Sequence, residues 1–307
     1  MSNNLVKVID LIPGRSRPLP VVDAEQLSEE TFWDMYVSKH LPVLIKGAVA
    51  SWPAVTQWKR PGYVEGRCGD AKAITFRTFN PIPVVRNAGF MGREPIAECI
   101  KEMRSASDTE TLSIPAARLP PALASDIGGY RFFDKRNSRP LHYPAKRIFI
   151  YKNASTEWHF HGFDETLTSQ LVGSKRISLF RLTRSEWPQY EPLLKANFHH
   201  MNGRERFFPA DAQLTKYEGV LEAGDSVYIP PVWWHGVDPV DAEVGMTLAH
   251  CFRSPLRRFG DWSDPVTRVC IRDLLSKLRV PRALMAMGGI SLSSLSRRFA
   301  GEPWIRT

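Results

Sequence analysis

Two histidine-bearing segments far apart in the sequence limit what this chain can fold into. The first, residues 156–165, places His159 and His161 two positions apart and Glu165 four positions after the second histidine. Side chains two apart on a strand point to the same face, so both imidazoles can enter one cavity. The second segment, residues 224–235, is a β-rich stretch that ends at His235. If the two segments lie side by side, His235 closes the cluster from a neighbouring strand.

Imidazole and carboxylate together are the ligand types that bind iron, manganese, zinc, copper or nickel in proteins. A lone histidine in an apolar stretch is usually a hydrogen-bonded core residue, but the paired spacing and the second segment favour a metal site. Thiolate ligands are absent from both segments. The sequence therefore predicts a metal site inside a small β-barrel, with His159, His161, Glu165 and His235 as candidate ligands.

The composition is that of a globular protein with a substantial core. Hydrophobic residues make up 43% of the 307 residues and aromatic residues 11%. No apolar run is long enough for a transmembrane helix, and the N-terminus lacks the basic-then-apolar pattern of a signal peptide. The four cysteines lie far apart with no Cys-x-x-Cys spacing, which is typical of reduced thiols. We therefore expect a cytoplasmic protein with no membrane contact.

The charge balance is basic, with 41 Lys and Arg residues against 32 Asp and Glu residues and a net charge of +9. Much of the excess lies after residue 252. A solvated helical surface explains such a tail more often than an acidic partner does, although attraction to nucleic acid or phosphate is the alternative. No RNA-binding aromatic motif or zinc-finger spacing favours that alternative.

Three regions differ in their residue patterns. Residues 1–145 mix short helices and strands, including a capped helix over 28–40 and an amphipathic helix near 95–105. Residues 146–255 contain many short strands separated by Gly and Pro, which favours an antiparallel barrel or jelly roll. In residues 256–307 the apolar spacing becomes helical. We therefore expect an all-β core with helical additions at both ends.

Four segments, taken in order, match the pattern of a known family. Residues 32–58 look like its N-terminal signature, 156–160 like its first metal strand, 170–176 like its cosubstrate strand and 222–235 like its last metal strand. On these segments the chain resembles the JmjC and cupin-like 2-oxoglutarate oxygenases, which include asparaginyl hydroxylases and a tRNA wybutosine hydroxylase. The likeness covers nearly the whole chain. It implies a double-stranded β-helix of the jelly-roll type.

The resemblance also implies a chemistry. Such a barrel holds Fe(II), takes 2-oxoglutarate as cosubstrate and hydroxylates a C–H bond with O2. It implies that Lys175 anchors the distal carboxylate of 2-oxoglutarate and that Thr156 assists. A buried ammonium without an anion is costly, so a carboxylate guest accounts for a lysine that points inward, with Arg176 outward. An exposed strand lysine is the alternative interpretation.

The metal motif departs from the family pattern. The family carries His-x-Asp or His-x-Glu, whereas the second position here is His161. The series His159, His161, Glu165 resembles the cupin motif, in which three histidines and a glutamate hold the metal. One arrangement joins His159, His161 and His235, with Glu165 as fourth ligand or just behind the ligands. In the other, a loop shift lets Asp164 or Glu165 complete two histidines and a carboxylate. The first needs no distortion of the strand.

Other histidines carry weaker expectations. His250 lies where relatives often have asparagine, so it is a candidate for cosubstrate contact, although a hydrogen-bonded core histidine fits the position equally well. His199 and His200 lie in a polar insertion and are expected to be exposed or to face the substrate.

Three functions follow from these patterns. The first is an Fe(II)- and 2-oxoglutarate-dependent hydroxylase acting on a peptide, a modified nucleoside or a metabolite. The second is a cupin-type metalloenzyme that uses O2, with iron or another divalent transition metal, and without 2-oxoglutarate. The third is a binding barrel without catalysis. The amphipathic C-terminal helices predict a homodimer, or else packing on the protein's own barrel.

Overall fold

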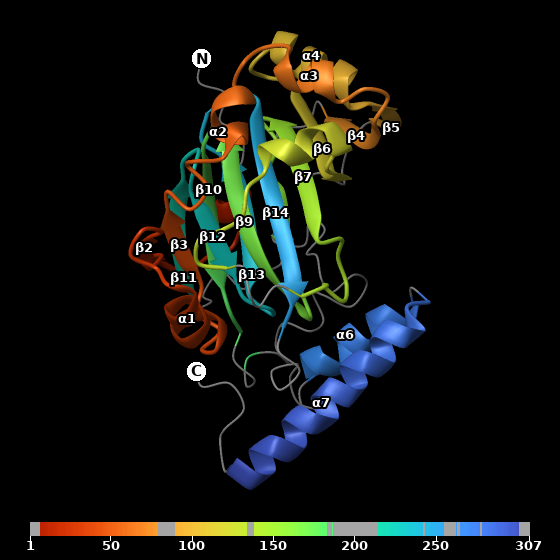
Figure 1. Ribbon diagram of the computed structural model, residues 1–307. Coiled ribbons are helices and arrows are strands. Elements are labelled where there is room, and N and C mark those ends of the chain that lie inside the picture. The colour runs from red at the N-terminus through yellow and green to blue at the C-terminus, as the bar shows by residue number, and fades with distance from the viewer. Residues whose placement is uncertain are drawn as a thin grey trace.

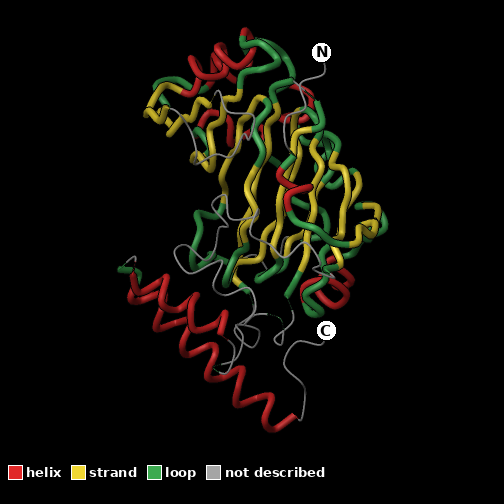
Figure 2. The backbone as a smooth tube through the Cα atoms, turned by 180° about the vertical axis from the view of Figure 1, so that it is seen from behind, coloured by secondary structure: helices red, strands yellow, loops and turns green. Residues whose placement is uncertain are grey.

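A computed structural model describes residues 7–78, 90–133, 138–182, 186, 214–241, 243–254, 262, 265–276 and 278–300. Within these residues the strands form two facing sheets, seen from two sides in Figures 1 and 2. His199 and His200 lie outside the described residues.

The larger sheet has nine strands. In spatial order they are β2 (Val21–Asp23), β3 (Val43–Lys46), β12 (Ser226–Ile229), β9 (Asp164–Val172), β14 (Gly245–Arg253), β7 (Lys146–Lys152), β6 (Thr111–Arg118), β4 (Lys72–Thr78) and β5 (Phe90–Pro95). The smaller sheet has five strands. In spatial order they are β1 (Arg15–Pro18), β11 (Thr215–Leu221), β10 (Lys175–Phe180), β13 (Trp234–Pro239) and β8 (Thr156–His159).

The chain passes back and forth between the two sheets from β7 to β14. Strands β7, β9, β12 and β14 belong to the larger sheet, and β8, β10, β11 and β13 to the smaller one. This winding is a double-stranded β-helix of the jelly-roll type, so the predicted fold class is confirmed. Strands from the N-terminal region extend both sheets at their edges. The division of the chain at residues 145 and 255 stays a prediction.

Helices lie mainly at the two ends of the sheets (Figure 1). Their bounds are η1 (Val8–Leu11), α1 (Glu29–Thr31), η2 (Phe32–Val37), α2 (Pro53–Gln57), α3 (Tyr63–Arg67), α4 (Ile96–Ser105), η3 (Pro121–Asp126), α6 (Pro265–Ser276) and α7 (Val280–Ala300). The predicted cap is present, because the Ser28 hydroxyl accepts the Thr31 N–H at 3.1 Å. The helix continues in π form through η2. No helix in the described part of the chain has the length and hydropathy of a membrane span.

Three apolar clusters hold these layers together. The largest lies on the outer face of the nine-stranded sheet, where Leu167, Leu171 and Leu248 pack with side chains from η2, α2 and α4. A second lies between the sheets around Ile177 and Leu179. The third joins the end of the barrel at Phe160 to α6 and α7. The inner faces of the two sheets are therefore only partly filled by apolar side chains, which leaves room for a site.

Candidate metal centre and cosubstrate cavity

A cavity of about 410 Å³ lies between the two sheets. Strands β8, β10 and β13 line it from the smaller sheet, and β7, β9 and β14 from the larger one. Because side chains alternate along a strand, every second residue of each strand faces this space. A candidate residue on one of these strands can therefore contribute to the site only if its side chain points inward.

His159, His161 and His235 meet on one side of this cavity. Their ring centroids are 5.3 Å apart for His159 and His161, 4.1 Å for His159 and His235, and 4.9 Å for His161 and His235. One ligand atom from each ring lies within 4.8 Å of the other two. The pairing of β13 with β8 places His235 directly opposite His159. Strand register therefore brings His159 and His235 together, and His161 joins them from the segment just after β8.

Each imidazole is oriented through its Nδ1 atom. The Nδ1 of His159 bonds the Glu157 carbonyl at 2.8 Å, and that of His235 bonds the Trp233 carbonyl at 3.0 Å. A carbonyl only accepts, so both rings carry their proton on Nδ1 and present Nε2 as the ligand atom. His161 Nδ1 lies 2.7 Å from the Thr166 hydroxyl. Such partners behind a histidine ligand fix its ring and tautomer.

Burial keeps the His161 imidazole of the cluster in its neutral form, which can bind a metal cation. Desolvation, followed by the neighbouring His235 and His159, lowers the pKa of His161 well below its ordinary value. His161 is therefore neutral at pH 7, and neutral imidazole is the form that ligates a metal. No ion is needed to explain the ring positions, but the chemistry of the donor set fits a divalent transition metal.

Two local features bring the metal strands together. Val232 has a φ of 67°, and its N–H donates to the His161 carbonyl at 2.7 Å, which ties the turn before β13 to the first metal strand. Gly236, next to His235, lies against the Trp158 indole. A Cβ there would come within 2.9 Å of the ring. The absence of a side chain at Gly236 therefore lets β8 pack closely on β13 at the level of the histidines.

Glu165 and Asp164 do not join the histidine cluster. Glu165 accepts hydrogen bonds from Tyr228, at 2.6 Å, and from Ser254. Asp164 accepts backbone N–H bonds from residues 141–143 at 2.7–2.8 Å. Strand β9 already begins at Asp164, and Thr166 is its residue that faces the cavity and the histidines. Strand alternation turns Glu165 to the opposite face, so the structure does not support it as a ligand.

Lys175 points into the cavity and Arg176 points outward, as expected. Lys175 is buried, and its Nζ donates to the Thr247 hydroxyl at 2.9 Å. No carboxylate in the described part of the chain forms an ion pair with it. Burial lowers the pKa of Lys175 to about 7. This ammonium therefore lacks an anion among the described residues, and a carboxylate guest would supply one.

A hydrogen-bonded chain supports Lys175 from behind. Thr247 donates to Gln170 at 2.8 Å, and the Gln170 amide donates to the Tyr151 hydroxyl at 2.9 Å. Thr156 lines the same cavity, but the hydroxyl that contacts Lys175 is that of Thr247. The sequence pattern did not reveal Thr247, although its inward position follows from alternation along β14.

His250 lies on the opposite face of β14 from the cavity. Thr247 and Ala249 line the cavity, so His250 turns to the outer cluster, 5.7 Å from the Tyr130 ring and 5.6 Å from the Phe133 ring. Its Nδ1 has no hydrogen-bond partner among the described residues, and burial lowers its pKa to about 4. Strand alternation thus turns His250 away from the cavity, which disfavours the predicted contact with a cosubstrate, although that contact stays a prediction.

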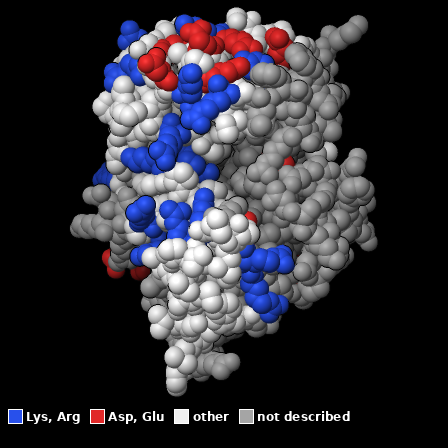
Figure 3. Space-filling model, turned by 90° about the vertical axis from the view of Figure 1, so that its right-hand side faces the viewer, with Lys and Arg blue, Asp and Glu red and all other residues white. Residues whose placement is uncertain are grey.

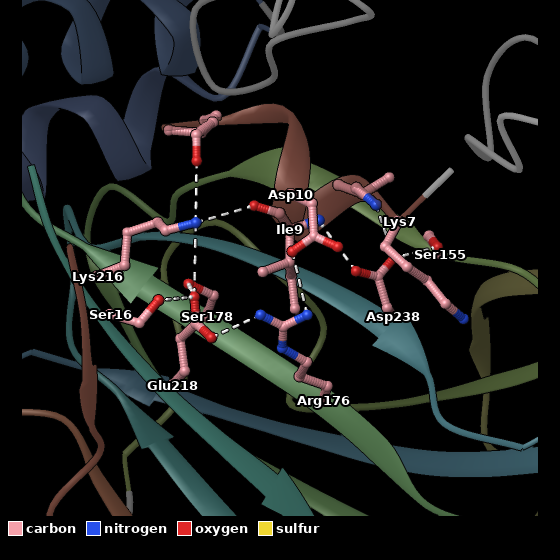
Figure 4. Close-up of polar contacts among 12 residues, drawn as sticks. Lys7, Ile9, Asp10, Ser16, Ser155, Arg176, Ser178, Lys216, Glu218 and Asp238 are labelled. Carbon is pink, nitrogen blue, oxygen red and sulfur yellow. Dashed lines mark hydrogen bonds and ion pairs between the residues drawn. The ribbon is translucent and has the colours of Figure 1, made fainter. Parts of the chain in front are cut away.

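A polar network on the outer face of the smaller sheet holds the site strands in place (Figure 4). Asp238 accepts the N–H groups of Val8 and Ile9 at 2.9 and 3.0 Å and the Ser155 hydroxyl at 2.5 Å. Arg176 pairs with Glu218 at 2.7 Å. Asp238 and Arg176 are sequence neighbours of residues that line the site, but their side chains lie on the other face of the sheet. The network thus fixes β8, β10, β11 and β13 from behind.

The cavity also contains a residue that the sequence pattern did not single out. Arg147 on β7 is buried among the lining residues, and its guanidinium lies 4.2 Å from the Tyr143 ring centroid. Tyr143 in turn lies 4.8 Å from the His161 ring. The pattern of β7 carried no signal, because apolar and polar residues occupy both of its faces.

Comparison with known proteins agrees with this architecture. The family described as "Cupin-like domain" matches residues 29–255. The chain is 25% identical over 266 residues to "Lysine-specific demethylase JMJ30" of Arabidopsis thaliana, a match that covers 77% of this chain and 56% of that protein. It is 21% identical over 264 residues to "Lysine-specific demethylase 8" of Xenopus tropicalis, covering 75% and 54%. It is 24% identical over 261 residues to "tRNA wybutosine-synthesizing protein 4" of Aspergillus oryzae, covering 77% and 23%.

The chain thus spans about half the length of the two demethylases, and less of the third protein. The family match covers more than half of this chain and agrees with the resemblance seen in the four sequence segments. The chain belongs to the cupin-like domain family, with JmjC-type relatives.

Proposed function

We propose that this protein is an Fe(II)-dependent oxygenase that uses 2-oxoglutarate to oxidise a C–H bond of its substrate. The observation that supports this most is the pairing, in one cavity, of a three-imidazole cluster with a buried lysine that has no acidic partner among the described residues. When bound, iron with O2 and 2-oxoglutarate supplies the oxidising power for such a reaction. The relatives named for demethylation and for wybutosine synthesis support an oxygenase of this type.

The residues divide into two groups in this proposal. His159, His161 and His235 hold the metal through Nε2, with their Nδ1 atoms fixed from behind. Lys175, held in place by the Thr247 hydroxyl, binds the distal carboxylate of 2-oxoglutarate. Lys175 lies opposite Pro239, four residues from the level of His235, which is roughly 13 Å by strand rise. A lysine side chain and a five-carbon diacid together span that separation.

The strongest rival is a cupin-type metalloenzyme that uses O2 without 2-oxoglutarate. The absence of a carboxylate from the described cluster favours this alternative, because the ligand set then differs from that of the resembling oxygenases. A barrel that binds ligands without catalysis is the third possibility. It needs neither stoichiometric metal nor a cosubstrate.

Succinate formation tests the proposal. The Fe(II)-loaded protein is incubated with 2-oxoglutarate in air, and succinate and O2 consumption are followed together. We expect succinate from the wild type, none from the Lys175→Met variant, and wild-type turnover from Lys216→Met. Lys216 is also a buried lysine, but it bonds the Ile9 and Ile12 carbonyls outside the cavity. O2 uptake without succinate would favour the cupin-type enzyme, and a metal-free protein inert to both would favour the binding barrel.

The substrate is proposed only by class: a peptide side chain, a modified nucleoside or a metabolite. Removal of an N-methyl group and hydroxylation both begin at a C–H bond. The names of the relatives are therefore compatible with one chemistry on different substrates.

We also infer a homodimer formed through α7. One face of α6 and α7 packs on the protein's own barrel through Leu274, Ala283 and Ile290. The other face of α7 exposes Leu284, Leu292 and Leu295 by 53–60%. A second copy of the same helix covers such a patch with a self-complementary contact.

A further inference from the structure

Arg147 is a buried cation whose hydrogen-bonding capacity is almost unused. It is 7% exposed, and among the described contacts its Nη2 donates only to the Cys251 thiol at 3.4 Å. No acceptor in the described part of the chain bonds its Nε. A guanidinium carries five N–H donors and stays charged at any physiological pH, so a weak thiol acceptor leaves it largely unsatisfied.

Asp164 offsets the charge of Arg147 in part, because the two side chains attract each other electrostatically, but it does not bond the guanidinium. Asp164 accepts three backbone N–H groups and forms no ion pair with Arg147 among the described contacts. A buried charge of this kind is costly unless a partner binds it. Asp164 and the Tyr143 and Phe149 rings offset part of this cost, but the N–H donors of Arg147 have only the Cys251 thiol as acceptor among the described contacts, and a bound ligand can supply a stronger one.

The position of Arg147 separates it from the proposed cosubstrate site. Arg147 bonds Cys251, whereas Lys175 bonds Thr247, and these two anchors lie four residues apart on β14. By strand rise this separation is roughly 13 Å. Tyr143 packs between Arg147 and His161. The two cations thus lie at different places in the cavity, with Arg147 beside the metal cluster.

We propose that Arg147 binds a carboxylate of the primary substrate and so holds the substrate next to the metal cluster. This inference rests on the proposed function, because it assumes that the histidines bind the metal and that Lys175 binds the cosubstrate. The guanidinium carbon of Arg147 lies 4.2 Å from the Tyr143 ring centroid and 5.6 Å from the Phe149 ring centroid, and both rings line the cavity, so the substrate carries its carboxylate on an apolar body. The planar fork of the guanidinium can donate two parallel N–H groups to the two oxygens of a carboxylate.

The surface near Arg147 favours the approach of an anion. Arg118 on β6 pairs in register with Arg147, and both Arg118 and the adjacent Lys146 are exposed. Lys and Arg side chains gather in the middle of the face on which β4, β5 and β7 lie, whereas acidic side chains gather at its upper end (Figure 3). Such a field raises the rate at which acidic ligands arrive.

The test uses three probes that share one ring: benzoate, benzamide and phenyl phosphate. Each is titrated calorimetrically into the full-length protein loaded with redox-inert Zn(II), with and without saturating 2-oxoglutarate. We expect the wild type to bind benzoate about tenfold more tightly than benzamide, since a charge-assisted contact to a guanidinium has that size. Arg147→Met should bind the two probes equally. Lys175→Met should keep the preference for benzoate.

Three results would overturn the inference: equal binding of benzoate and benzamide by the wild type, a preference that survives in Arg147→Met, or one that is lost in Lys175→Met instead. Tighter binding of phenyl phosphate would refute the carboxylate assignment. If Arg147→Met does not fold, Arg147→Lys serves, because it keeps the charge but not the planar fork and should show a smaller preference. Failure of 2-oxoglutarate to bind, with the Arg147-dependent preference intact, would remove the proposed function and leave this inference standing.

Discussion

Replacement of Lys175 by methionine should stabilise the ligand-free protein, and more so at low pH. Lys175 is buried without an acidic partner among the described residues, and burial lowers its pKa from 10.5 to about 7. In the unfolded chain the lysine keeps its ordinary pKa. Between these two values the unfolded state binds more protons than the folded state, so stability rises with pH. Below pH 7 both states are protonated, and the folded protein bears the full penalty of a buried ammonium.

The size of the effect follows from the two pKa values. Because the pKa of Lys175 falls from 10.5 in the unfolded chain to about 7 in the folded protein, its buried ammonium lowers the free energy of unfolding by about 5 kcal/mol at pH 6, compared with a side chain that does not titrate. Linkage then predicts that Lys175 makes the wild type about 3 kcal/mol more stable at pH 9 than at pH 6. Methionine has no proton to exchange and a similar length, so this contribution disappears in the variant.

Urea unfolding at pH 6, 7, 8 and 9 measures the difference between wild type and Lys175→Met, in which other titrations cancel. We expect the advantage of the variant to shrink steadily from pH 7 upward. Lys216→Met is the matched control: it leaves the Ile9 and Ile12 carbonyls without their donor and should lower stability by about 1–3 kcal/mol. A difference between wild type and Lys175→Met that does not change with pH would refute the reasoning.

Four further outcomes are expected. His235→Ala should lose stoichiometric metal in elemental analysis while its circular dichroism stays that of the wild type. Glu165→Gln should keep its metal, because the carboxylate lies on the other face of β9; metal loss would restore it as a ligand. Gly236→Ala should destabilise by about 1–3 kcal/mol and weaken metal binding, whereas Gly66→Ala, which meets nothing within 4 Å, should do neither. Leu284→Glu should convert the dimer to monomer in sedimentation velocity, and a wild type that is monomeric at micromolar concentration would exclude the dimer.

The fold was accessible from the sequence because its signals are local and repeated. Short strands with Gly and Pro between them, the Ser28 cap and the helical spacing after residue 256 each report on one element. The strand order was not visible in these signals. It came from the family resemblance, since the sequence alone does not say which strands pair.

The candidate site was predictable where a short sequence spacing decided the geometry, even though β8 ends at His159 and His161 follows it. His159 and His161 share a face by their spacing, and His235 joins them through the register of β13 with β8. For His250, only the order of residues along β14 shows that its side chain points away from the cavity, so its predicted cosubstrate contact stays a prediction that this position disfavours. Both faces of this strand are buried, so the hydrophobic pattern does not show which face is inward. The same limit hid Thr247 and Arg147, because their strands too are buried on both sides.

Uncompensated positive charges in the cavity lower the stability of the ligand-free protein. Three neutral imidazoles replace the usual two and a carboxylate, so a bound metal would carry one more uncompensated charge than in the resembling oxygenases. Lys175 and Arg147 add two cations to the same space. Each anionic guest removes part of this penalty, and a ligand at a hundred times its Kd stabilises by about 2.7 kcal/mol. Carboxylates can therefore be screened by thermal unfolding. A compound that raises the Tm of the wild type, but not that of Arg147→Met, is a candidate substrate.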